Sequence, residues 1–317
     1  MDNRIAAHMY KKKRMTPWRD IRQNYGSYIL ALPAIIYVFI FSYCTIPYMF
    51  TAFQKFSYKT GLLNSEFIGF KNFETFLLSS RSMQVTVNTL KLNFLFIIFV
   101  TVIAIFFSII LYEVTGKLFK KINQSFFIFP HFLSWVIVSY VVYGLFASER
   151  GLVNKILELF GASPYVWYNL PKPWTWIMVG LRVWKGVGIN SVIFLAAITA
   201  VDTSLYEAAY IDGATHFQRA MRITLPLIMP TVMTLTLLNI GRIFYGDFGM
   251  IYAIIRDNGV LYPSVDIIDT YVFRLLRRTG DPSQAMAVGL FQSVLGFILV
   301  LSTNAVTKKY FEEGALF

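Results

Sequence analysis

Six long apolar stretches, separated by polar loops, dominate the pattern of the chain. They cover about residues 28–52, 85–112, 124–147, 174–200, 226–250 and 283–306. Each has roughly 20 residues or more, the length of a helix that crosses the hydrocarbon core of a bilayer. The stretches are continuously apolar rather than alternating, and lipid admits only helices or closed barrels. The pattern therefore predicts an all-α membrane protein with six transmembrane helices.

Polar segments flank these stretches and set the predicted domain organisation. Residues 1–27 form a basic N-terminal segment, 28–306 the six-span domain and 307–317 a C-terminal tail. The first apolar stretch is too long for the core of a signal peptide, so we interpret it as an uncleaved first span. Basic segments tend to stay in the cytoplasm. With six spans, both termini and the loops at 113–123 and 201–225 are then cytoplasmic.

Composition agrees with a multi-pass protein of the cell membrane. The chain has 317 residues, of which 56% are hydrophobic and 17% aromatic, and its mean hydropathy is +0.56. Its net charge of +12 could suggest nucleic acid, but the basic residues lie at the ends of apolar stretches, so we expect membrane lipid and no nucleic acid as a partner. Cys44 is the only cysteine and the three histidines lie far apart, so we expect no disulfide and no metal site. Trp174 and Trp176 are predicted to be interfacial anchors of the fourth span.

The loop between the fourth and fifth spans carries its own helix signals. Ser204 followed by Glu207 has the spacing of a capping box, which predicts a helix that begins near Leu205. Gly213 is suited to a left-handed cap at the end of that helix. The small side chains of Ala208 and Ala209 let another surface approach the helix closely.

A second helix is predicted directly afterwards. Thr215 and Gln218 repeat the capping spacing ahead of a short helix at 216–222, and Pro226 fits the first turn of the fifth span. The loop therefore predicts helix, turn, helix. Its function is either to dock a partner or, as the plainer alternative, only to connect two spans.

The spacing E-A-A-x3-G-x9-I-x-L-P in this loop resembles the signature of permease subunits of ATP-binding-cassette importers of the binding-protein-dependent kind. The sequence has every fixed position of that signature: Glu207, Ala208, Ala209, Gly213, Ile223, Leu225 and Pro226. The segments at 68–73, 183–197, 269–292 and 314–317 resemble the carbohydrate branch of this family, and most of all its oligosaccharide and polysaccharide permeases of Gram-positive bacteria.

The resemblance implies a type I importer permease fold with a cytoplasmic coupling helix. Its partners would be a second permease subunit in a heterodimer, two ATP-binding-cassette subunits and an extracellular sugar-binding lipoprotein. ATP and Mg would be used by the ATPase and no cofactor would be held in this chain. The residues that would couple the chain to the ATPase are Glu207, Ala208, Ala209, Asp212, Gly213, Ile223, Leu225 and Pro226.

Polar residues inside the apolar stretches are functional candidates, because charged groups in lipid are costly. Arg182 and Lys185 lie on one face of the fourth span, and a set in the outer half of the fifth span could meet them. The alternative is structural, with Asp247 paired to a nearby cation. Asn88, Asn93 and Gln292 are interpreted as packing residues. The candidate substrate path comprises Arg182, Lys185, Asn190, Asn239, Arg242, Tyr245 and Asp247.

Other functions remain as alternatives at this point. A membrane-bound enzyme is not favoured, because the sequence has no G-x-x-x-x-G-K, H-E-x-x-H or G-x-S-x-G motif. A secondary transporter driven by an ion gradient would be expected to show internal repeats and carboxylates at mid-membrane. An importer permease for a solute other than sugar is a further alternative. We therefore predict a non-catalytic permease subunit that imports oligosaccharides or polysaccharide fragments.

Overall fold

The computed structural model describes residues 17–149 and 151–310, which fall into one unit that ends at Phe50 and a second that begins at Thr51. In the first unit, α2 (Pro17–Gln23) and α3 (Tyr25–Val38) are followed by a π-helical turn, η1 (Phe39–Tyr43), and the 3₁₀ helix η2 (Ile46–Phe53) continues into the second unit. Side chains 21–50 are all exposed. An apolar helix exposed all round is typical of a lipid-facing span.

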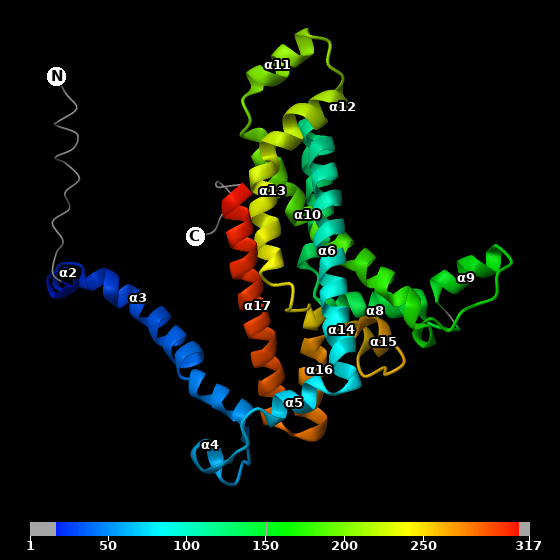
Figure 1. The fold of residues 1–317 in the computed structure, drawn as a ribbon. Coiled ribbons are helices and arrows are strands. Elements are labelled where there is room, and N and C mark those ends of the chain that lie inside the picture. Colours follow the sequence, from blue (N-terminus) through cyan, green and yellow to red (C-terminus); the bar gives the residue numbers. More distant parts are fainter. Residues whose placement is uncertain (1–16, 150, 311–317) are drawn as a thin grey trace. The chain divides into compact units, whose positions relative to one another are not determined.

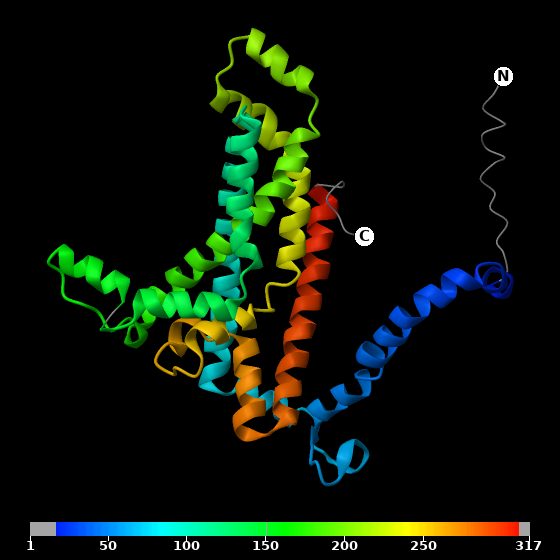
Figure 2. The ribbon, with the colours of Figure 1, turned by 180° about the vertical axis from the view of Figure 1, so that it is seen from behind.

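Long helices form the framework of the second unit and run alongside one another (Figures 1 and 2). They are α6 (Ser80–Glu113), α10 (Pro171–Thr199), α13 (Leu225–Ile240) and α17 (Pro282–Tyr310). The short helix α11 (Thr203–Ile211) lies at one end of this bundle, and α5 (Lys71–Leu77) and α16 (Ile268–Arg274) lie at the other.

Short elements complete the second unit. Strands β1 (Gln54–Lys55) and β2 (Glu66–Phe67) pair antiparallel, with Gln54 opposite Phe67. The remaining short helices are α4 (Gly61–Asn64), α9 (Leu152–Leu159), η3 (Trp167–Asn169), α12 (His216–Arg219), η4 (Ala220–Thr224), α14 (Phe248–Ile255), α15 (Tyr262–Val265) and η5 (Leu275–Thr279).

Within the described residues, five helices are long and apolar enough to cross a membrane: Tyr25–Phe53, Ser80–Glu113, Pro171–Thr199, His216–Ile240 and Pro282–Ala305. A sixth crossing exists only if α7 (Lys117–Phe132) and α8 (Trp135–Phe146) count as one span, and these helices meet at 96°. The predicted span at 124–147 is therefore not one straight helix but two helices with a break at 133–134. Pro130 lies in the last turn of α7, and Ser134 caps α8 by accepting the Ile137 N–H at 3.2 Å, so the sequence ends one helix and begins another.

The predicted fifth span at 226–250 also differs. Its helix begins earlier, because α12, η4 and α13 follow one another from His216 to Ile240 without a gap. It ends earlier as well, at Ile240, and a non-helical segment at 241–247 leads to α14. Asp247 is the N-cap of α14 and accepts the Met250 N–H at 3.0 Å.

The largest core cluster lies where α6, α8, α10 and α14 meet. Its members include Leu92, Val142, Met178 and Met250. Trp174 is fully buried in this cluster and donates its indole N–H to the Trp167 carbonyl at 2.8 Å. The predicted interfacial role of Trp174 is therefore wrong, whereas Trp176 is exposed.

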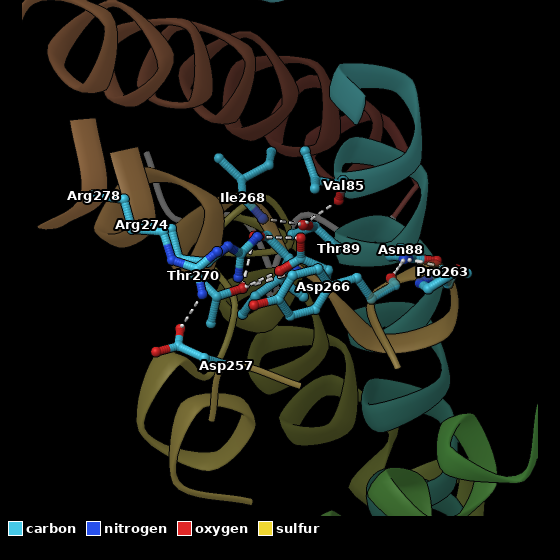
Figure 3. Close-up of polar contacts among 12 residues, drawn as sticks. Val85, Asn88, Thr89, Asp257, Pro263, Asp266, Ile268, Thr270, Arg274 and Arg278 are labelled. Atoms are coloured by element: carbon cyan, nitrogen blue, oxygen red, sulfur yellow. Dashed lines mark hydrogen bonds and ion pairs between the residues drawn. The ribbon is translucent and has the colours of Figure 1, made fainter. Parts of the chain in front are cut away.

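A polar cluster ties α15 and α16 to α6 (Figure 3). The Thr89 hydroxyl accepts the Ile268 N–H at 3.0 Å, and the Asn88 amide donates to the Tyr262 and Pro263 carbonyls at 3.3 and 3.2 Å. The predicted packing role of Asn88 is thus confirmed. These bonds satisfy backbone groups at the start of α16 and in α15, and so fix both short helices against a long one.

Candidate functional site

Two features of the second unit carry the predicted site residues: the loop around α11 and a polar cavity inside the bundle. The helix α11 begins at Thr203, and its N-cap is Asp202 rather than the predicted Ser204. The Asp202 carboxylate accepts the Ser204 N–H at 2.9 Å. Bonding to the backbone and side chain of Ser204 lowers the pKa of Asp202 below its ordinary value, because these bonds favour the charged carboxylate.

The end of α11 follows the prediction. Gly213 has φ +76°, and its N–H bonds to the Tyr210 carbonyl at 3.0 Å. The Ala214 N–H bonds to the Ala209 carbonyl at 2.9 Å, which completes a Schellman cap. Glycine is favoured here because a side chain is strained in the left-handed region.

The second capping box is present as predicted. The Gln218 side chain accepts the Thr215 N–H at 2.8 Å, and the Thr215 hydroxyl accepts the Gln218 N–H at 3.3 Å. The helix that starts here does not stop before Pro226 but continues through η4 into α13. A π turn ends two residues before Pro226, which has no N–H to give to a carbonyl four residues back.

The loop presents a face that no described part of the chain covers. Glu207, Ala208, Asp212 and Gly213 are exposed and Ala209 is half-buried. Large apolar side chains lie among them: Tyr210 is 73%, Ile211 84% and Phe217 74% exposed. Of the connecting residues, Ile223 and Leu225 are half-buried and Pro226 is exposed. A capped helix with exposed apolar and acidic side chains is a suitable docking surface.

The inner side of the loop contacts the end of α6. Tyr206, the buried residue of α11, shares a hydrogen bond with the Thr224 hydroxyl at 3.0 Å and packs on the Tyr112 ring at 5.5 Å. Glu113, the last residue of α6, lies 2.6 Å from His216 and 3.6 Å from Arg219. Tyr206, Tyr112 and Glu113 were not predicted, because partners about a hundred positions apart in the chain leave no local signal in the sequence.

The cavity lies among α6, α7, α10, α13 and the segment at 241–247, and has a volume of about 540 Å³. Its lining includes all the predicted substrate-path residues: Arg182, Lys185, Asn190, Asn239, Arg242, Tyr245 and Asp247. The structure thus brings the whole set together, while a role in transport stays a prediction. Asn93, Phe96, Thr101 and His131 also line the cavity and were missing from the predicted set.

Asp247 is the centre of the polar contacts in the cavity. Its carboxylate accepts from the Arg182 guanidinium at 3.0 Å and from the Trp135 indole N–H at 3.1 Å. It also caps α14. The structural alternative predicted that Asp247 pairs with a nearby cation, and the structure shows this pair with Arg182. Both residues of the pair also line the cavity.

Lys185 is held by the break between α7 and α8. Its ammonium group donates to the Leu133 carbonyl, which lies at the break, and sits over the Trp135 ring at 4.8 Å from the centroid. Asn190 donates to the Gly186 carbonyl at 2.8 Å within α10. The bent pair therefore contributes to the cavity a carbonyl acceptor and an aromatic face for the cation.

The non-helical segment at 241–247 is held by side chains from neighbouring helices. Asn93 donates to the Ile243 carbonyl at 2.7 Å, and Gln292 donates to the Phe244 carbonyl at 2.6 Å. The predicted packing roles of Asn93 and Gln292 are confirmed. The Tyr245 hydroxyl bonds to Ser293 at 2.9 Å. Non-helical backbone at this depth is tolerated where it lines a cavity and its polar groups are satisfied.

The fold and the cavity define a multi-pass membrane permease: a bundle of spans around a polar cavity, with a capped loop at one end. The profile of the binding-protein-dependent transport system inner membrane component family matches residues 104–312. The chain belongs to this family.

Relatives and a solved structure agree with this class. Protein LplB of Bacillus subtilis (strain 168) is 34% identical over 93% of this chain and 92% of its own length. The polygalacturonan/rhamnogalacturonan transport system permease protein YteP of the same strain is 35% identical over 96% and 94%. The structure of a bacterial ABC transporter involved in the import of the acidic polysaccharide alginate matches with a TM-score of 0.85 and 31% identity, over 93% of this chain and 99% of that one. The predicted family and the type I importer permease fold are confirmed.

Proposed function

We propose that this chain is a permease subunit of an ATP-driven importer of oligosaccharides or polysaccharide fragments. The proposal rests on similarity, over more than nine-tenths of the chain, to a polygalacturonan/rhamnogalacturonan permease and an alginate importer. The polar cavity supports it. Sugars need hydrogen-bond partners and aromatic surface, and the lining combines amide, hydroxyl and charged side chains with Phe96 and Tyr245.

The partners in this proposal are a second permease subunit, two ATP-binding-cassette subunits and an extracellular sugar-binding lipoprotein. This chain hydrolyses no ATP and holds no cofactor, and the ATPase subunits use ATP and Mg. In this proposal the chain is a multi-pass protein of the cell membrane, and the loop around α11 and both termini lie in the cytoplasm. The exposed face of α11, with Glu207, Ala208 and Asp212, docks on the ATPase.

The proposed mechanism uses the stiffness of the loop. Caps at both ends of α11 and the contacts of Tyr206 with Thr224 and Tyr112 connect the docking face to α13 and α6. A displacement imposed at α11 is therefore transmitted to two helices that line the cavity. A loop without caps would deform instead.

Reconstitution tests this proposal. The chain is purified with its partner subunits, placed in liposomes, and assayed for oligosaccharide uptake and ATP hydrolysis together. Uptake should require ATP and Mg, and an ion gradient alone should drive none. Uptake by the chain alone under an ion gradient would instead support a secondary transporter.

A variant on the docking face sharpens the test. Glu207→Lys should reduce uptake per ATP hydrolysed, because it reverses the charge offered to the ATPase. Glu158→Lys, on the exposed side of α9, makes the same change away from the loop and should leave uptake unchanged. Equal uptake per ATP hydrolysed by the two variants would show that the loop does not couple ATP hydrolysis to uptake.

A further inference from the structure

The cavity is positively charged. Among the residues that the structure describes, its lining carries three permanent cations, Arg182, Lys185 and Arg242, and one carboxylate, Asp247. His131 also lines the cavity but carries no permanent charge. Positive charge inside a membrane bundle is costly unless an anion offsets it.

The lining carboxylate is already engaged. Asp247 accepts bonds from Arg182, from the Trp135 indole and from the Met250 N–H, as the cap of α14. It therefore offsets Arg182 and leaves the charges of Lys185 and Arg242 uncompensated.

A second carboxylate lies just behind the lining but is engaged too. Asp269 accepts the Gly246 N–H at 2.8 Å and lies 3.4 Å from the Gln292 amide. It belongs to the scaffold of the segment at 241–247 rather than to the cavity surface. Even when Asp269 is counted, the cations exceed the carboxylates by one.

The surplus cations have free hydrogen-bonding capacity. Lys185 has three donors, and the Leu133 carbonyl accepts from one. Within the part of the chain that the structure describes, the exposed Arg242 side chain forms no hydrogen bond or ion pair. Arg242 lies two residues after the end of α13, and its guanidinium can bind a carboxylate or phosphate with two parallel bonds.

We propose that the saccharide that enters this cavity is anionic, and that Arg242 and Lys185 bind its acidic groups. This inference rests on the proposed function, since it names the class of saccharide. A neutral saccharide would leave the surplus positive charge of the lining without a counter-charge in a site partly shielded from water. An acidic one, with carboxylate or phosphate groups, supplies the missing charge and accepts the free donors.

Binding to the complex of the two permease subunits and the two ATPase subunits in lipid nanodiscs, without the sugar-binding lipoprotein, tests the inference. The probes are a uronate trisaccharide, the neutral trisaccharide of the corresponding hexose, and a phosphorylated form of that neutral sugar, each measured by calorimetry. At least one anionic probe should bind about tenfold or more tightly than the neutral one. The stronger anionic probe identifies carboxylate or phosphate as the recognised group.

Variants assign the effect to Arg242. Arg242→Gln should weaken anionic binding about tenfold and change neutral binding less than about twofold, whereas Arg242→Lys should retain most of the affinity. Arg278→Gln removes an exposed arginine that pairs with Asp257 outside the cavity, and should leave binding unchanged.

Salt gives a readout that needs no variant. Between about 0.1 M and about 1 M NaCl the screening length falls from about 10 Å to about 3 Å, so anionic binding should weaken and neutral binding should not. Neutral binding as tight as anionic binding would overturn the inference and leave the proposed function intact. Binding of no saccharide at all would overturn the proposed function itself.

Discussion

Loss of one buried charge should destabilise the second unit strongly. Asp266 and Arg274 form an ion pair between the end of α15 and the end of α16 (Figure 3). Asp266 is 3% and Arg274 is 6% exposed. The Thr270 hydroxyl donates to Asp266 at 2.6 Å, and the guanidinium lies over the Tyr262 ring at 4.1 Å. We predict that Asp266→Asn leaves the guanidinium buried without a counter-charge.

The expected loss in the free energy of unfolding follows from the burial of the pair. Removal of one partner of a buried ion pair costs about 3–5 kcal/mol, because an unpaired charge stays out of water. The ion pair between Arg278 and Asp257 is a matched control. Its charged groups lie 3.5 Å apart, but the Arg278 side chain is 56% exposed and the Asp257 side chain is 38% exposed. Exposed pairs contribute about 0–1 kcal/mol, so Arg278→Gln should have little effect.

Thermal unfolding of the purified complex in nanodiscs measures the difference. Asp266→Asn should lower Tm several times more than Arg278→Gln. The double variant Asp266→Leu with Arg274→Met should recover much of the loss, because replacement of both charges by apolar groups leaves neither unpaired. Equal Tm values for Asp266→Asn and Arg278→Gln would refute the reasoning from burial.

Three further variants test the loop and the cavity. Tyr206→Phe removes the hydroxyl that bonds to Thr224, and should lower stability by about 1 kcal/mol and reduce uptake per ATP; unchanged coupling would contradict transmission through Tyr206. Gly213→Ala places a side chain at φ +76° and should destabilise the loop by about 1–2 kcal/mol, seen as faster proteolysis of α11. Asp247→Asn should lower the free energy of unfolding by about 1 kcal/mol, because the Arg182 side chain is 41% exposed and then bonds to a neutral acceptor; a wild-type Tm would show that the charge of Asp247 does not stabilise the fold.

Local sequence signals predicted the parts of the fold that local physics determines. Long apolar stretches correspond to the membrane-spanning helices, since chain length across a bilayer is a property of each segment alone. Gly213 and the pair Thr215 and Gln218 were predicted for the same reason, because each cap is formed within six residues. The prediction of Ser204 as the N-cap was wrong, because Asp202, two positions earlier, is also a capping residue and is the one that caps α11.

Hydropathy could not predict where a span breaks. Residues on both sides of the break at 133–134 are apolar, so the signal continues while the backbone turns by 96°. The same applies to Trp174, because an aromatic residue near a span end can face the interface or the core. Its burial is decided by α6, α8 and α14, which are distant in sequence.

The break at 241–247 explains why the predicted path residues share one cavity although the predicted geometry was wrong. In a continuous helix Arg242 and Asp247, five residues apart, would point about 140° from each other, because each residue turns the helix by about 100°. Both line the cavity because the helix ends at Ile240. Asn93 and Gln292 donate to backbone carbonyls of the segment, and Asp269 accepts its Gly246 N–H. The side chains of the segment are therefore not needed to bond these backbone groups. The break therefore brings these polar side chains into one cavity within an apolar bundle. Side chains of the surrounding helices form the hydrogen bonds that the backbone of the segment loses where the helix ends.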